Sequence, residues 1–235
     1  MKAIYKRELA AYFTSPIGYI FMAVYLALSG AVFVFTTLYS ASSNTGMYFM
    51  LMIFLYIILI PLLTMKLLSE ERKLKTEQIL LTSPISLFEM VFAKFLAAFT
   101  LFSGTFVIGC LEFGVLYLYS DSVNTASMVS GALGVLFLGG AFIAIGLFVS
   151  SLTENQLVSA ILSIFSIFVM LAMGLVSQSI EFAPLRILVK WLSVFDRYSD
   201  FSYGLFSLGA IFYYVSIIVA FLFLTVRIYE KRRWE

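Results

Sequence analysis

Six predominantly apolar runs, each long enough to cross a bilayer as a helix, constrain this chain more than any other feature. A membrane-spanning helix needs about 20 predominantly apolar residues. The runs are continuous and do not alternate, and lone strands would leave backbone groups unsatisfied in lipid, which excludes spanning strands. We therefore predict an all-α polytopic membrane protein, a single transmembrane domain over residues 1–235. The runs cover residues 17–38, 47–65, 95–119, 127–151, 157–176 and 208–226.

Composition supports a membrane protein and narrows the function. Hydrophobic residues make up 62% of the chain and charged residues 12%, against roughly half and a quarter in soluble domains. The net charge of +2 is too small to indicate a nucleic-acid partner. The single cysteine, Cys110, excludes an internal disulfide, and the absence of histidine removes the commonest general base and metal ligand. The basic start resembles a signal peptide, but the run at 17–38 exceeds its usual apolar length, so we interpret it as a retained first span.

Basic residues predict the orientation. Twelve of the 15 Lys and Arg residues lie before the first run, between the second and third, or after the sixth. By the positive-inside rule, both termini and the loop between runs two and three are cytoplasmic, as in a multi-pass protein of the inner, cytoplasmic membrane. The twelve are Lys2, Lys6, Arg7, Lys66, Arg72, Lys73, Lys75, Lys94, Arg227, Lys231, Arg232 and Arg233.

Two segments outside the runs have helical patterning. At residues 1–15, four apolar or aromatic residues repeat at helical spacing before a Ser-Pro break, which predicts a short helix in the cytoplasmic interface; a basic flank without a further role is the alternative. At residues 184–197, an apolar stripe beside three basic residues predicts an interfacial or partly re-entrant helix on the outer side.

The loop at residues 69–88 combines charge with a compact apolar cluster, which indicates a partner surface. Thr76 can cap a helix and Pro84 disfavours helical geometry before it, so we predict a helix of about two turns between them. Ser86 and Glu89 then have the spacing of a capping box at the start of the next helix. A solvated loop with an incidental helix is the alternative for this segment.

Two internal segments resemble a known family. The run Glu70-Glu-Arg-Lys-Leu-Lys-Thr-Glu-Gln-Ile-Leu-Leu-Thr-Ser-Pro-Ile-Ser86, followed by Phe92-Ala-Lys94, resembles the cytoplasmic loop of ABC-2-type transporter permeases. Residues 138–156, Leu-Gly-Gly-Ala-Phe-Ile-Ala-Ile-Gly-Leu-Phe-Val-Ser-Ser-Leu-Thr-Glu-Asn-Gln, look like the fourth span and inner turn of gliding-motility-associated permeases in that family. Residues 5–19 and 229–234 also look similar. The loop departs from the family pattern where Lys75 and Ala93 replace Gly and Gln78 replaces Glu.

The resemblance implies a permease subunit that exports an amphiphilic or bulky cargo. Its partners would be the lipid bilayer, a second copy or sister permease, and a separate ABC ATPase bound beneath each. Residues 1–15 would be the family's elbow helix. The chain has no GxxxxGK[ST] phosphate loop, so ATP and Mg would be bound by the ATPase, and this chain would be neither an enzyme nor a cofactor binder. The coupling helix that docks on the ATPase would comprise Thr76, Glu77, Gln78, Ile79, Leu80 and Leu81.

Two further sites are candidates for function. Glu112 is an acid within the third run, where an ionisable group costs about 2.5 kcal/mol or more; it either lines a translocation path or reaches outer headgroups or Arg186, Lys190 or Arg197. The second is the inner turn Glu154, Asn155 and Gln156, which either touches the ATPase or the neighbouring loop or is a simple polar turn. In the fourth run we favour helix packing over a gating hinge as the role of Gly139, Gly140 and Gly146.

Three rival functions remain open at this stage. An ion-coupled carrier or channel would normally have several intramembrane polar groups and often a repeat, whereas we find one acid and no obvious repeat. A membrane-embedded enzyme needs catalytic groups that the sequence does not show. An ABC complex that transmits mechanical work without transport would use the same coupling helix.

Overall fold

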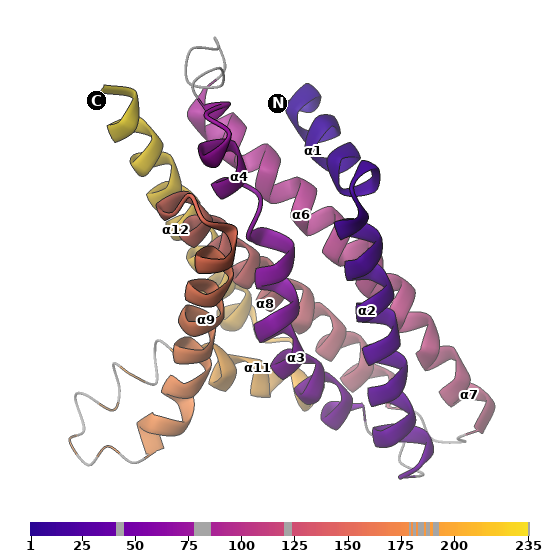
Figure 1. The fold of residues 1–235 in the computed structure, drawn as a ribbon. Coiled ribbons are helices and arrows are strands. Elements are labelled where there is room, and N and C mark those ends of the chain that lie inside the picture. The colour runs from indigo at the N-terminus through magenta and orange to yellow at the C-terminus, as the bar shows by residue number, and fades with distance from the viewer. Residues whose placement is uncertain are drawn as a thin grey trace.

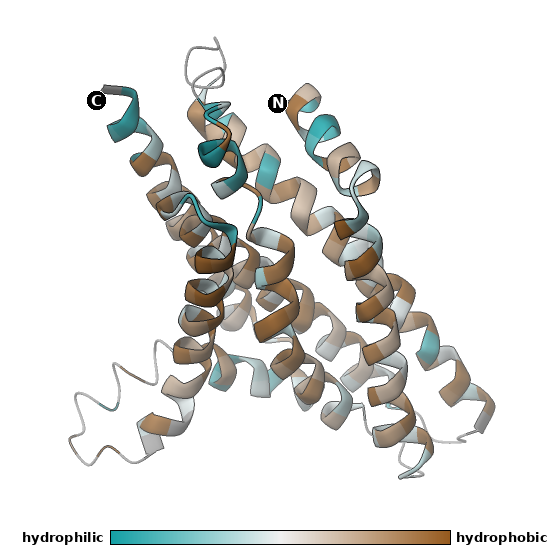
Figure 2. Cartoon of the chain, viewed as in Figure 1, coloured by the Kyte–Doolittle hydropathy of each residue, from teal (hydrophilic) through white to brown (hydrophobic). Residues whose placement is uncertain are grey.

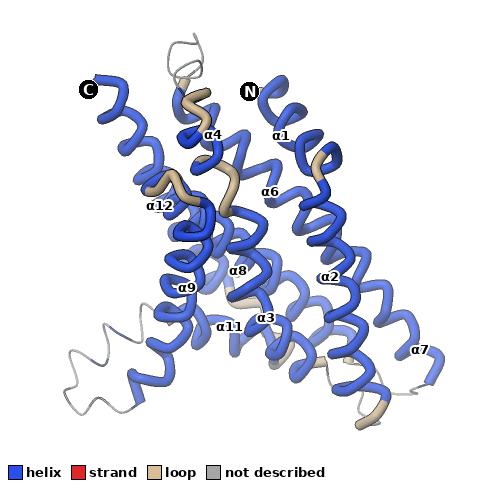
Figure 3. The backbone as a smooth tube through the Cα atoms, in the orientation of Figure 1, coloured by secondary structure: helices blue, strands red, loops and turns tan. Residues whose placement is uncertain are grey.

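The chain folds into helices and connecting turns. The computed structural model describes residues 1–40, 45–77, 86–119, 124–178, 180, 182, 186, 189 and 193–234, and these contain no strand (Figure 3). The all-α prediction is confirmed. In chain order the helices are α1 (Lys2–Thr14), α2 (Pro16–Phe33), the π-helical turn η1 (Val34–Leu38), α3 (Gly46–Thr64), α4 (Ser69–Lys73), α6 (Leu87–Cys110), the 3-10 helix η2 (Leu111–Val115), α7 (Leu116–Tyr119), α8 (Thr125–Leu152), α9 (Gln156–Gln178), α11 (Val194–Ser202) and α12 (Leu208–Trp234).

Within the described ranges, six helical stretches are long and apolar enough to span a membrane. Figure 2 shows apolar residues along the middle of the bundle and hydrophilic ones gathered at α4 and at the end of α12. The prediction of a polytopic membrane protein is confirmed. The stretches are Pro16–Leu38, Gly46–Lys73, Leu87–Leu118, Thr125–Leu152, Gln156–Gly174 and Leu208–Arg233.

Helix α8 is the centre of the bundle and packs against α3, α6, α9, α11 and α12. Its glycines permit this close packing. A Cβ atom added at Gly139 would overlap the ring of Phe102 on α6, and one added at Gly146 would overlap Thr64 on α3. Because α8 runs unbroken from Thr125 to Leu152, these glycines serve helix approach, as the packing hypothesis expected.

The helix of the third apolar run begins two turns before the run itself. The run starts at residue 95, whereas α6 begins at Leu87, where the capping box predicted a helix start. Ser86 is the N-cap, and its side chain accepts a hydrogen bond from the amide of Glu89 at 3.2 Å, so this half of the predicted capping box forms. The first two turns of α6 thus carry Lys94 into the bundle.

Both termini lie at one end of the bundle, together with α1 and α4 (Figure 1). We call this the N/C end, and we call the other end, where α7 and α11 lie, the opposite end. At the opposite end, α11 covers the last residues of the helix expected at residues 184–197 and continues past them to Ser202, and the described residues 186 and 189 are also helical. The Ser193 side chain sets this start by accepting a hydrogen bond from the Asp196 amide at 3.2 Å. Most of residues 184–192 lie outside the described part.

Candidate functional site

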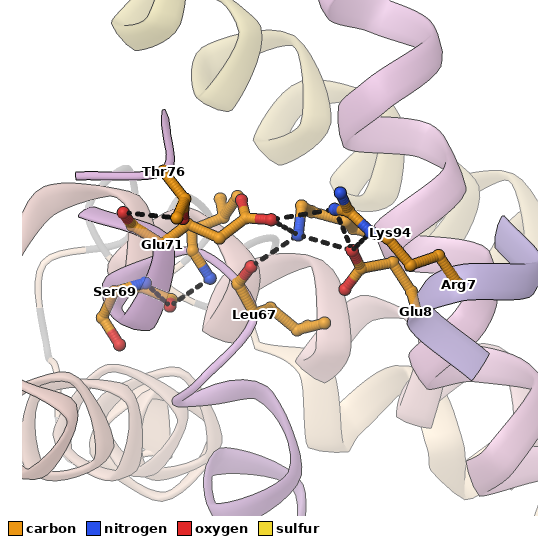
Figure 4. Close-up of polar contacts among 9 residues, drawn as sticks. Arg7, Glu8, Leu67, Ser69, Glu71, Thr76 and Lys94 are labelled. Carbon is orange, nitrogen blue, oxygen red and sulfur yellow. Dashed lines mark hydrogen bonds and ion pairs between the residues drawn. The ribbon is translucent and has the colours of Figure 1, made fainter. Parts of the chain in front are cut away.

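A buried lysine lies at the centre of the N/C end. Lys94 of α6 is only 1% exposed, although the sequence placed it in a cytoplasmic loop. Its Nζ atom donates to the Leu67 carbonyl oxygen at 2.9 Å and lies 2.8 Å from Glu71 and 3.1 Å from Glu8 (Figure 4). A buried ammonium is stable only when it is paired and hydrogen-bonded, and these three oxygens provide that environment.

Arg7 completes what we call the ion cluster, which consists of Arg7, Glu8, Glu71 and Lys94. Its Nη2 atom lies 2.6 Å from Glu8 and 3.0 Å from Glu71. Hydrogen bonding to Glu8 raises the pKa of Arg7 above its usual value. Two cations and two carboxylates from α1, α4 and α6 therefore meet in one cluster (Figure 4). Each helix is tied to the other two through charge.

The cluster forms because α4 is fixed beside α8. The Ser150 hydroxyl of α8 accepts hydrogen bonds from the backbone amides of Leu68 and Ser69, at 3.2 and 3.1 Å, and donates to the Met65 carbonyl at 3.1 Å. These amides belong to the first turn of α4, where intrahelical partners are lacking. Ser150 therefore fixes the point at which the chain leaves α3, and Glu71 follows less than one turn later.

The turn between α8 and α9 contacts the same segment. Glu154 lies 2.9 Å from Nε of Arg72, and Nη1 of Arg72 donates to the Leu152 carbonyl at 2.9 Å. Asn155 caps α9, since its side-chain oxygen accepts from the Leu157 amide at 2.9 Å. Gln156 is the first residue of α9. Of the three residues singled out in the sequence, Glu154 bridges to α4, Asn155 organises the turn and Gln156 starts the next helix.

The last helix reaches the same end. Nη2 of Arg232 donates to the Ser151 carbonyl at 2.6 Å, and Nη1 lies 3.5 Å from Glu77. Arg232 also lies over the ring of Tyr229, 5.4 Å from its centroid. Of the predicted coupling residues, the structure describes Thr76 and Glu77. Glu77 forms an ion pair with another helix.

The segment entering the predicted coupling helix has a strained backbone. Lys75 has φ 56°, in the left-handed region that favours glycine, and Thr76 donates its hydroxyl to the Glu71 carbonyl at 3.3 Å. Lys75 occupies the position where the resembling family has Gly, and a glycine adopts this positive φ without the steric cost that a side chain brings. Gln78, Ile79, Leu80 and Leu81 lie outside the described residues, so the predicted two-turn helix stays a prediction.

Glu112 is distant from the ion cluster in the fold and lies in η2. Both of its carboxylate oxygens lie 3.3 Å from the Ser29 hydroxyl of α2, which also bonds Tyr48 of α3 at 2.8 Å. The sequence had offered outer basic residues or headgroups as partners. Arg197, one of them, lies over the Tyr213 ring, and Lys190 lies outside the described residues. Helix α2 thus supplies a partner for Glu112 that the sequence did not predict.

Sequence reasoning missed the ion cluster, although one signal was available. Lys94 lies in a largely apolar stretch from Leu87 to Cys110, and a lysine in such a stretch requires an acidic partner. The acidic candidates at Glu8 and Glu71 were visible, but the sequence gives no indication of which helices pack together.

Comparison with known families supplies independent information. A family model described as ABC-2 family transporter protein matches residues 17–230. The match includes the four middle apolar stretches, nearly all of the first and last, and the segment from α4 to α6. A comparison with curated proteins finds no match.

Proposed function

The chain belongs to the ABC-2 family of transporter proteins, and we propose that it is the permease subunit through which a separate ATPase drives export of an amphiphilic or bulky cargo. The ATPase would bind at the N/C end, against the segment from Thr76 to Leu81. ATP and Mg would be held by that partner. This proposal places the N/C end in the cytoplasm of a cell whose inner membrane the protein spans.

The observation that carries the proposal is the convergence of charge on the residues flanking residues 78–85. Glu71 before them and Lys94 after them meet in the ion cluster with α1. Arg72 joins the α8–α9 turn, and Glu77 joins α12. A force applied to this segment is therefore carried by ion pairs to four parts of the bundle: α1, α6, the α8–α9 turn and α12. Such a connection is what a docked ATPase needs in order to move membrane helices.

We further propose that two permeases act together, either two copies or this chain with a sister permease. As the family resemblance implies, one ATPase would bind beneath each of the two subunits. The likeness to gliding-motility-associated permeases stays a prediction. Cargo is moved between the two subunits in this proposal, with the ion clusters of both subunits on the ATPase side.

The direct test is affinity purification of the tagged chain from its native membrane in mild detergent, with an ATPase assay on the eluate. Wild type is compared with the double variant Leu80→Asp, Leu81→Asp. The matched control is Leu205→Asp, Leu208→Asp, which places the same charges on exposed leucines at the opposite end. We expect ATPase activity with wild type and control, and loss of at least nine-tenths of it with the coupling variant.

Size-exclusion profiles must show that all three proteins remain folded. If a well-folded coupling variant retains the ATPase, the docking segment is wrong. If even wild type carries no ATPase, an ion-coupled carrier or channel replaces the proposal. If an ATPase is bound but no cargo moves in vesicles, the complex transmits mechanical work instead.

A further inference from the structure

Two adjoining cavities lie beside α1, one polar and one apolar. The first, which we call the head cavity, has a volume of about 300 Å³ and is lined by Glu8, Lys66 and Glu70 together with Ser15 and Ile17. It lies where α1, the start of α2 and the connection from α3 to α4 meet. Three charged side chains thus face one small space at the N/C end.

The second cavity, which we call the tail groove, has a volume of about 240 Å³ between α2 and α3. All of its lining residues are apolar, among them Ile17, Val24, Leu62 and Met65. Val24 and Leu62 are both 42% exposed, so the groove opens to the outside of the bundle. Ile17 lines both cavities, and Met65 in the groove directly precedes Lys66 in the head cavity. The two spaces are therefore neighbours that meet at Ile17.

We propose that these cavities bind one phospholipid with a primary ammonium headgroup, of the phosphatidylethanolamine type, from the adjacent leaflet. The headgroup occupies the head cavity and one acyl chain lies in the tail groove. A polar space beside an apolar one matches an amphiphile, and the head cavity, at about 300 Å³, lies at the lower end of the volume range of ligand pockets. This inference does not rest on the proposed transport function.

The phosphate has a cationic subsite. Lys66 lines the head cavity, and so does Ser15, the N-cap of α2. The Ser15 side chain makes no capping hydrogen bond, so the backbone amides of Ile17 and Gly18, which follow a proline that has no N–H, donate no hydrogen bond to the cap. A helix N-terminus with free amides attracts phosphate, and the lysine ammonium adds a full charge beside it.

The headgroup amine has an anionic subsite. Glu70 is 41% exposed and lies 3.9 Å from Lys66, a loose pair that leaves carboxylate oxygens for another donor. The ion pairs of Glu8 with Arg7 and Lys94 both use Oε1, and Oε2 points away from them in Figure 4. A primary ammonium has three N–H donors for such oxygens. A quaternary choline has none.

Charge also selects against anionic lipids. Two carboxylates and one ammonium line the head cavity, so a phosphatidylglycerol headgroup meets more negative than positive charge and has no amine to offset it. The structure therefore ranks phosphatidylethanolamine above phosphatidylcholine and phosphatidylglycerol of the same acyl chains.

Native mass spectrometry on the delipidated full chain in detergent tests this ranking. Each of the three lipids is titrated separately, and the first bound lipid is quantified. We expect phosphatidylethanolamine to bind about tenfold more tightly than either other lipid, the size of one lost charge-assisted hydrogen bond. Glu70→Gln should weaken it by a similar factor, while Glu230→Gln, a half-exposed acid on α12, should leave it unchanged.

The apolar part is tested by filling the groove. Leu62→Trp should reduce phosphatidylethanolamine binding at least fivefold, whereas Ile58→Trp, an exposed residue one turn away on α3 that lines neither cavity, should not. Val24→Trp fills the groove from α2 and replaces Leu62→Trp if that variant unfolds. Equal binding of the three lipids, a preference for phosphatidylglycerol, or full binding in both tryptophan variants would overturn the proposal.

Discussion

The two ends of the bundle are held together by different interactions. At the N/C end, charged side chains from α1, α4, α6 and α12 pair across long stretches of sequence. At the opposite end, neutral hydroxyls hold α11 to the bundle: Ser127 donates to the Ser202 carbonyl at 2.8 Å and Ser130 to the Phe201 carbonyl at 2.7 Å. Buried charges require every partner, whereas each neutral bond contributes separately. The comparison indicates that loss of a charge in the ion cluster affects α1, α4 and α6 together, whereas loss of a hydroxyl at Ser127 or Ser130 affects α8 and α11.

The largest expected effect comes from the ion cluster. Lys94→Met leaves Glu8 and Glu71 with only Arg7 as a shared cation, so one negative charge is uncompensated, and breaking such a buried pair costs about 3–5 kcal/mol. Thermal unfolding in detergent should show a strongly lowered Tm. Lys73→Met, an exposed lysine, is the control and should behave as wild type.

A double variant sharpens the same prediction. Adding Glu71→Gln to Lys94→Met removes the uncompensated charge and leaves Arg7 paired with Glu8, so most of the lost stability should return. If Lys94→Met alone unfolds at the wild-type Tm, the cluster does not stabilise the N/C end.

At the opposite end we expect a smaller loss. The double variant Ser127→Ala, Ser130→Ala removes two neutral hydrogen bonds that each contribute about 1 kcal/mol. The decrease in Tm should be the same at low and high salt. Ser216→Ala, whose hydroxyl bonds only within its own helix, serves as the control, and a salt-dependent loss would contradict the neutral character assigned to this end.

Lys75→Gly should stabilise the N/C end by about 0.5–1 kcal/mol. Lys75 has φ 56°, and a side chain in the left-handed region costs about 1–2 kcal/mol. Glycine removes this steric cost, but part of the gain is lost because glycine has more conformational entropy in the unfolded chain. A rise in Tm checks this. Lys73→Gly, inside α4, should lower it instead, and equal changes at the two positions would argue against backbone strain at Lys75.

The smallest effect concerns the pair between Arg72 and Glu154, whose carboxylate side chain is 61% exposed. A double-mutant cycle with Arg72→Gln and Glu154→Gln should give a coupling energy of about 0.2–1 kcal/mol that declines at high salt. A coupling energy that salt does not change would mean that the pair is more enclosed than its exposure indicates.

Much of the fold follows from the sequence because the hydropathy of neighbouring residues is enough to predict each spanning helix. The start of α2 is marked by Pro16 and that of α6 by Ser86, and the apolar runs gave all six spanning stretches. The burial of Lys94, which lies between two apolar runs, was not predicted. A charge inside a helix is stabilised by partners from distant segments, here Glu8 and Glu71, and hydropathy carries no information about them.

The features of the candidate site that were predictable are those set by residues within one short segment of the chain. The turn at Glu154 and the departure from glycine at Lys75 were both visible in the sequence. The pairings of Arg72 with Glu154, Arg232 with Glu77 and Glu112 with Ser29 depend on which helices are neighbours. Helix neighbours in a bundle are set by surfaces such as the glycines of α8, which a single sequence does not assign to partners.

The length of α12 sets an order of assembly. Its 27 residues extend about 40 Å at 1.5 Å per residue, while the hydrocarbon core is about 30 Å thick, so the end carrying Arg232 projects beyond the lipid. The ion cluster can close once α8 has been synthesised and Ser150 holds α4, but the contacts of Arg232 with Glu77 and Ser151 must wait until the final helix has been synthesised and inserted. Glu77 therefore lacks this arginine throughout synthesis, and its pairing marks a finished subunit.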